Sequence, residues 1–128
     1  MDIRLDGRAA LITGGSEGLG KGMALRFAES GADIAILARR PDALNAAKAE
    51  IEAVSKGKVI TLPCDLLDGA ATKAAFAEAN AALGKIDILV NNAGTSRAKA
   101  FDTVTDEEWE EDLELKLMAA IRLCRAAL

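Results

Sequence analysis

The sequence predicts an α/β domain with three layers, in which a parallel sheet lies between helices on both faces. Short apolar runs alternate four times with longer segments of helical periodicity, which is the pattern of βαβ units. The apolar runs carry few polar residues, as expected for parallel strands buried on both faces. Right-handed crossovers would then place the strands in the order 3-2-1-4.

The first two strand–helix units have the clearest boundaries. We expect a strand at residues 9–12, a helix at residues 19–30 and a second strand at residues 34–37. Pro41 stands at a position that the first turn of a helix tolerates. The helix after it presents one apolar stripe at three- and four-residue spacing, formed by Leu44, Ala47, Ile51 and Val54.

The third and fourth units follow the same pattern. A third strand is expected at residues 59–62 and a fourth at residues 86–90. Between them, Asp68 is suited to cap an alanine-rich helix, and Gly84 is suited to end it.

The last helix is the most apolar segment. Either Thr105 or Asp106 can cap it, and we expect it to run to the end of the chain. Residues 113–128 contain only four charged side chains, so this helix needs cover on more than one side. One stripe is expected to be core or interface: Trp109, Leu113, Leu117, Ala120 and Cys124. We therefore expect residues 1–128 to be a single, truncated domain, and we expect the chain to form a homo-oligomer.

Composition excludes several classes of function. A formal net charge of −4 without a basic stripe argues against nucleic acid as a partner. Histidine is absent and the two cysteines lie far apart, so no metal site is expected. No apolar run has the roughly 20 residues of a membrane span. The N-terminus lacks the features of a signal peptide, and we expect a cytoplasmic protein with two buried thiols.

The segment TGGSEGLG, from Thr13 to Gly20, carries the strongest functional signal. It follows an apolar run and opens a helical pattern. Gly14 permits a tight turn, Gly18 lets the backbone approach a pyrophosphate, and Gly20 lets helix and strand pack closely. The helix N-terminus then faces the anion. The motif predicts dinucleotide binding, and its alternative is a tight turn without a ligand.

A second signal, Asn91-Asn92-Ala93-Gly94, follows the fourth strand. Amides and small residues at the carboxyl end of a parallel strand can line a ligand crevice. An ordinary polar turn is the alternative.

Together with Cys64-Asp65-Leu66, these two motifs resemble the short-chain dehydrogenase/reductase family over essentially the whole chain. The resemblance implies a Rossmann-type fold, an NAD(P) cofactor, and hydride transfer to or from an alcohol or carbonyl substrate. The family's catalytic Tyr-x-x-x-Lys pair lies in sequence that this chain does not contain, and the chain has no tyrosine. We therefore assign no catalytic residue and expect the C-terminal half of the family's fold to be missing.

The resemblance also implies roles for individual residues. Those expected around the pyrophosphate and adjoining ribose are Gly14, Ser16, Gly18, Leu19 and Gly20. Asp65 would accept a hydrogen bond from the adenine amino group, and the Leu66 backbone would contact the ring. The residues expected beside the nicotinamide ribose are Asn91 and Gly94, with Asn92 and Ala93 supporting them.

Charge after the second strand favours NADP over NAD. The position where the family's NAD-preferring members carry an acid is Ala38, followed by Arg39 and Arg40. Arginine can meet a 2′-phosphate with two charge-assisted hydrogen bonds, so Arg39 is placed at the cofactor. Glu17, also placed there, counts against NADP because many NADP-using relatives carry a basic residue at that point. A solvated charge pair is the alternative for the two arginines.

Other interpretations stay open. Lys116 falls where the family commonly carries an asparagine that anchors a water, but a surface lysine explains it equally well. The whole chain could be a non-catalytic dinucleotide-binding or dimerisation module, complete at 128 residues. A different nucleotide-binding domain, such as a methyltransferase that uses S-adenosylmethionine, is a further alternative.

Overall fold

Four parallel strands form the sheet at the centre of the molecule. The computed structural model describes residues 2–94 and 99–128. Its strands are β1 (Ala9–Thr13), β2 (Asp33–Ala38), β3 (Val59–Pro63) and β4 (Ile88–Val90). Their order is β3-β2-β1-β4, and every neighbouring pair is parallel. The predicted 3-2-1-4 order is confirmed.

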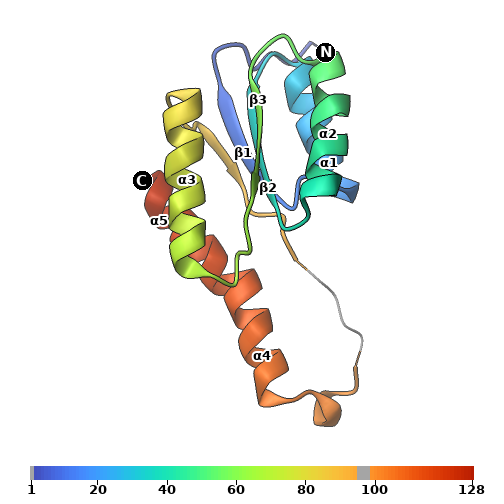
Figure 1. Cartoon of the computed structure of the whole chain (residues 1–128), viewed down its shortest axis with the longest axis vertical. Helices are drawn as coiled ribbons and strands as arrows, with labels where there is room; N and C mark the ends of the chain where they lie inside the picture. Colours follow the sequence, from blue (N-terminus) through green and yellow to red (C-terminus); the bar gives the residue numbers. More distant parts are fainter. Residues whose placement is uncertain (1, 95–98) are drawn as a thin grey trace.

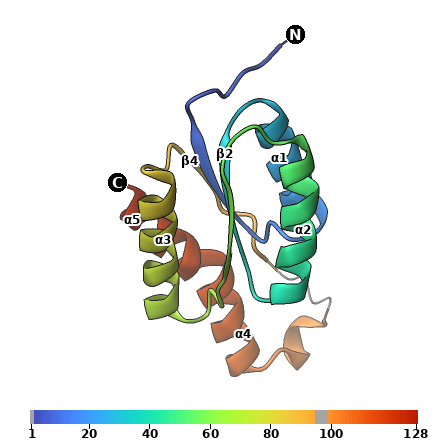
Figure 2. The same ribbon diagram turned by 45° about the horizontal axis from the view of Figure 1, so that its top comes forward.

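Helices cover both faces of this sheet. They are α1 (Gly18–Glu29), α2 (Pro41–Val54), α3 (Gly69–Leu83), α4 (Asp106–Leu113) and α5 (Ala119–Ala127). Helices α1 and α2 lie on one face and α3 and α5 on the other, whereas α4 extends beyond the end of the sheet (Figures 1 and 2). Within the described residues, no helix is both long enough and apolar enough to cross a membrane.

The alternating side chains of β1 build two separate cores. Ala9 and Leu11 belong to the core under α3 and α5. Ala10 and Ile12 belong to the core under α1 and α2. All four are at most 1% exposed, which confirms that the strand is buried on both faces as the apolar run predicted.

Side chains cap two of the helices. Asp68 Oδ1 accepts the N–H of Ala71 at 3.0 Å and opens α3. Thr105, rather than Asp106, is the cap of α4, since its hydroxyl accepts the N–H of Glu108 at 3.2 Å. Gly84 ends α3 in the left-handed conformation, as predicted.

Strand β4 is shorter than the predicted 86–90 because a side chain replaces backbone pairing at its start. Asp87 Oδ2 accepts the N–H of Ala9 at 2.9 Å, while the N–H of Asp87 donates to the carbonyl of Ala9 at 2.8 Å. The bond from Ala9, followed by that from Lys85, lowers the pKa of this carboxyl. Regular pairing begins only at Ile88.

The last helical segment departs from its prediction in two ways. A π-helical stretch, η2 (Glu114–Met118), interrupts it between α4 and α5. In this last segment, the buried residues are Ala119 and Leu123 of α5, and Leu115 of the π-helical stretch packs against the same core. The stripe predicted as core or interface is therefore not core: Trp109, Leu113, Leu117 and Cys124 are exposed. Consequently only one of the two thiols, Cys64, is buried.

Candidate functional site

A cleft of about 880 Å³ opens at the carboxyl end of the sheet. Residues that follow all four strands line it: Gly14 after β1, Arg39 after β2, Cys64 after β3 and Asn92 after β4. Successive strands are added on one side of β1 up to β3 and on its other side from β4 onward, which makes this the topological switch point where open α/β sheets bind ligands.

The structure brings most of the predicted cofactor residues together in this cleft. Ten of them line it: Gly14, Ser16, Glu17, Gly18, Leu19, Arg39, Asp65, Leu66, Ala93 and Gly94. Gly20 and Asn91 are not among the lining residues. The cleft extends beyond this group towards α4, where Trp109 and Lys116 line it.

The backbone of the glycine loop has conformations that let a ligand approach it closely. Gly14 has a φ of +65°, and a Cβ there would lie 3.0 Å from the Cα of Ala93. Gly18 has a φ of +55° with open space around the place of a Cβ, so its backbone is accessible. Gly20 lets α1 pack closely against the turn at Gly14, because a Cβ on Gly20 would collide with the carbonyl oxygen of Gly14.

One buried hydroxyl ties the two motifs together. Thr13, only 1% exposed, accepts the N–H groups of Asn92 and Ala93 at 3.0 Å each. The Asn92 side chain in turn donates to the carbonyl of Gly14 at 3.3 Å. These bonds hold residues 91–94 against the glycine loop. The family resemblance implied supporting roles for Asn92 and Ala93 but no role for Thr13, although Thr13 opens the glycine motif as a lone hydroxyl at the end of an apolar strand.

Two arginines stand at the end of β2, on one wall of the cleft. Arg40 Nη2 lies 2.9 Å from Glu17 Oε1 and Arg40 Nε lies 3.8 Å from Asp42 Oδ1. Within residues 2–94 and 99–128, Arg39 makes no such ion pair. The two arginines, equivalent in the sequence, are therefore distinct in the structure.

The residues after β3 form another wall of the cleft. Asp65 Oδ1 accepts the N–H of Leu67 at 3.0 Å, which fixes the orientation of its carboxylate. Leu66 is buried. Burial raises the pKa of the Cys64 thiol, and a hydrogen bond with Thr72 partly opposes this shift. Cys64 is buried, as predicted.

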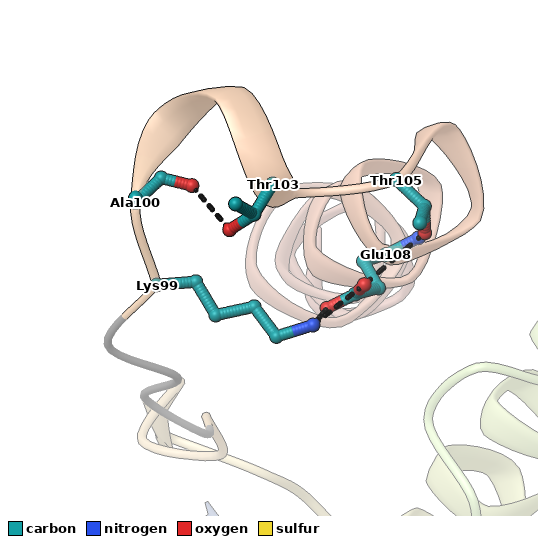
Figure 3. Close-up of polar contacts among 5 residues, drawn as sticks. All are labelled: Lys99, Ala100, Thr103, Thr105 and Glu108. Carbon is teal, nitrogen blue, oxygen red and sulfur yellow. Dashed lines mark hydrogen bonds and ion pairs between the residues drawn. The ribbon is translucent and has the colours of Figure 1, made fainter.

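Polar contacts organise the part of the cleft near α4 (Figure 3). Lys99 Nζ lies 2.8 Å from Glu108 Oε2. This contact lowers the pKa of Glu108, and a hydrogen bond from the backbone of Thr105 lowers it further. Trp109 meets Phe101 edge to face, with ring centroids 6.1 Å apart. Lys116 pairs with Asp112 at 3.2 Å and is about half exposed, so it is an ion-paired lysine at the rim.

Asn91 occupies a different position from the other predicted residues. Its side-chain amide donates to Cys124 Sγ at 3.5 Å, on α5. A role for Asn91 beside the nicotinamide ribose stays a prediction.

The chemistry available in the cleft is that of binding. Backbone N–H groups at the start of α1, an arginine and a carboxylate can recognise phosphate, ribose and base. Within the described residues, no three His, Cys, Asp or Glu side chains are grouped to hold a metal ion. The chain also has no tyrosine to exchange a hydroxyl proton with a substrate.

Known proteins resemble this chain in both sequence and structure. D-threitol dehydrogenase of Mycolicibacterium smegmatis is 34% identical over 125 residues, which are 98% of this chain and 48% of that protein. L-sorbose reductase of Gluconobacter frateurii, solved with NADPH and L-sorbose, has a TM-score of 0.94 at 35% identity, covering 99% of this chain and 48% of that one. A short-chain dehydrogenase of Burkholderia cenocepacia, solved with NADP, has a TM-score of 0.92 at 38% identity, covering 97% and 51%.

The chain thus spans about half the length of the curated relatives it matches. The family model for short-chain dehydrogenases matches residues 8–128. The strand order, the glycine loop and residues 91–94 after β4 agree with this match. This chain belongs to the short-chain dehydrogenase/reductase family.

Proposed function

We propose that the cleft binds a nicotinamide dinucleotide and takes NADP in preference to NAD. The observation that carries this proposal is the joined pair of loops at the switch point, with Arg39 at the end of β2 making no ion pair among residues 2–94 and 99–128. The glycine loop supports the fit. A side chain at Gly14 would press against the backbone of Ala93, and a side chain at Gly20 would collide with the carbonyl oxygen of Gly14. Two of the similar solved structures hold NADPH or NADP.

Different residues of this chain would bind different parts of the dinucleotide. The glycine loop, with Ser16 and Leu19, would hold the pyrophosphate at the start of α1. Asp65 and Leu66 would hold the adenine, Arg39 the 2′-phosphate, and residues 91–94 the nicotinamide ribose. When bound, the nicotinamide supplies hydride chemistry. The chain's own residues bind and orient it.

We propose further that residues 1–128 are the cofactor-binding domain of an oxidoreductase that acts on an alcohol or carbonyl compound. Support comes from the relatives, which are named dehydrogenases and reductases and are about twice as long. Proton transfer would come from a Tyr-x-x-x-Lys pair outside this sequence, so the chain alone should bind the cofactor without turnover. A cytoplasmic location fits its two free thiols.

Replacing Arg39 by glutamine tests the cofactor proposal. We expect calorimetry to show NADPH binding to this chain, with a dissociation constant about 10-fold higher for Arg39→Gln, because a charge-assisted bidentate contact is lost. NADH binding should change by less than about twofold. No heat of binding with either nucleotide would refute the proposed function, and equal losses for both nucleotides would refute the assignment of the 2′-phosphate to Arg39.

The exposed apolar residues of the last helical segment favour self-association. Trp109, Leu113 and Leu117 are 43%, 52% and 51% exposed, and large exposed apolar patches mark interaction sites. We expect a dimer in sedimentation velocity, and Leu117→Glu should raise its dissociation constant at least about 10-fold. The control is Ile3→Glu, at another exposed apolar residue. A monomer at all concentrations would contradict the proposal, whereas a dimer without nucleotide binding would favour a non-catalytic dimerisation module.

A further inference from the structure

The cleft continues beyond the proposed cofactor residues into a second part, which we call the α4 end. One of its walls is a single helix face, since six of its lining residues recur at helical spacing: Glu108, Trp109, Glu111, Asp112, Leu115 and Lys116. Leu115 and Ala93 both line the cleft and pack against the same core. Because Ala93 belongs to the loop proposed for the nicotinamide ribose, the α4 end adjoins the reactive end of the cofactor.

Two exposed aromatic rings give the α4 end an apolar surface. Phe101 and Trp109 both line it, and they are 83% and 43% exposed. An apolar ligand that covers exposed ring surface removes it from water, which favours binding. Of the residues in the exposed stripe, Trp109 lines the cleft, whereas Leu113 and Leu117 do not. The wall of the cleft and the stripe proposed for self-association are therefore different faces of the same segment.

The charged side chains of the α4 end already have partners. Lys99 Nζ contacts both carboxylate oxygens of Glu108, at 2.9 and 2.8 Å (Figure 3). Lys116 Nζ lies 3.2 Å from Asp112 Oδ2, and the carboxylate of Glu111 also makes a polar or electrostatic contact. A charged group on a ligand would have to replace one of these partners, which would leave the displaced side chain unpaired, and it would also lose its own hydration. An ionic ligand therefore gains little here.

We propose that the α4 end of the cleft binds the ring of a substrate that is an uncharged aromatic or alicyclic alcohol or ketone. The inference rests on the proposed function, which supplies the alcohol or carbonyl chemistry, and it names the class of substrate. The ring lies against Phe101 and Trp109, and the hydroxyl or carbonyl group is directed to residues 91–94. Compounds that carry a carboxylate, phosphate or ammonium group bind more weakly, because the charged side chains of the α4 end already have partners.

Trp109 is the reporter for the test, because the chain contains one tryptophan and no tyrosine. Three probes share a phenyl ring and a secondary hydroxyl group and differ in charge: 1-phenylethanol is neutral, mandelate is an anion and 2-amino-1-phenylethanol is a cation. Each is titrated into the chain without nucleotide while the emission of Trp109 is recorded. We expect a saturable change with 1-phenylethanol, and dissociation constants at least about 5-fold higher for the two ionic probes.

Phe101→Ala tests where the ring of the ligand lies and leaves the reporter in place. Phe101 is exposed, so the chain should still fold without this ring. We expect the dissociation constant for 1-phenylethanol to rise about 3- to 10-fold, because one of the two rings is lost. The matched control is Leu113→Ala, at an exposed apolar residue of α4 that does not line the cleft. It should leave this dissociation constant unchanged.

Lys116→Gln tests the charge argument in the opposite direction. It removes the partner of Asp112, whose carboxylate is then available to an ammonium group. We expect the dissociation constant for 2-amino-1-phenylethanol to fall by about 2- to 5-fold, while that for 1-phenylethanol stays the same. The matched control is Lys21→Gln, which removes the lysine 3.1 Å from Glu50, outside the residues that line the cleft. It should change neither value.

The outcomes separate this inference from the proposed function, because calorimetry with NADPH is carried out on the same chain. If NADPH binds but 1-phenylethanol leaves the emission of Trp109 unchanged, or the ionic probes bind as tightly as the neutral one, only the substrate class is overturned. Equal losses in Phe101→Ala and Leu113→Ala would overturn the placement of the ring. If NADPH does not bind, the proposed function fails, and the claim that the ligand of the α4 end is a substrate fails with it.

Discussion

Replacing Thr13 by valine is expected to destabilise the chain by about 2–4 kcal/mol and to abolish measurable NADPH binding. Valine has nearly the same shape, so the change removes the hydroxyl and little else. The N–H groups of Asn92 and Ala93 then lose their acceptor in a partly buried place, and each unsatisfied donor costs about 1–3 kcal/mol. Urea denaturation measures the free energy of unfolding, and calorimetry measures the binding.

Serine at the same position is the control, because it keeps the hydroxyl and loses one methyl group. Thr13→Ser should recover most of the stability and bind NADPH within a few-fold of wild type. If valine were as stable as serine, the two hydrogen bonds would not be what holds residues 91–94 against the glycine loop.

Replacing Gly20 by alanine should be the second most damaging change, although alanine is the better helix former. A Cβ at this position would collide with the carbonyl oxygen of Gly14 and lie 2.5 Å from the side-chain nitrogen of Asn92. Both belong to the loops that form the cleft. We expect a loss of about 1–3 kcal/mol in the free energy of unfolding and NADPH binding at least about 10-fold weaker, because the turn that faces the pyrophosphate must shift.

The same helix offers a matched control two residues further on. Nothing lies within 4 Å of a Cβ placed on Gly22, so Gly22→Ala should stabilise the chain by up to about 1 kcal/mol and bind NADPH normally. Equal losses in the two variants would mean that close packing at Gly20 is not required.

The strand order and the ends of the helices before β4 could be predicted because local signals specify them. The apolar runs define buried strands, and residues such as Asp68 and Gly84 mark helix ends through bonds or backbone shapes confined to a few residues. The handedness of crossovers then leaves one arrangement of the sheet. For the same reason ten of the predicted cofactor residues share one cleft, since the carboxyl ends of parallel strands meet at one edge.

The features that escaped prediction depend on contacts between distant parts of the chain. The π-helical stretch η2 has no local signal; it is bridged by an ion pair between Glu114 and Arg122, whose atoms lie 2.8 Å apart. The stripe that begins at Trp109 starts in α4, which extends beyond the end of the sheet (Figure 1), and Trp109 and Leu113 are exposed there. Likewise, the sequence places Arg39 and Arg40 side by side, but only the fold shows that Glu17 engages one of them.

An NMR titration of the ¹⁵N-labelled chain with NADPH shows whether the two loops joined by Thr13 form a dinucleotide site. We expect saturable shifts of the amide signals of residues 14–20, Arg39, Leu66 and residues 92–94, while signals of α3 stay in place. Absence of shifts in the glycine loop at millimolar NADPH, or shifts confined to α4 and α5, would mean that the two loops do not form this site.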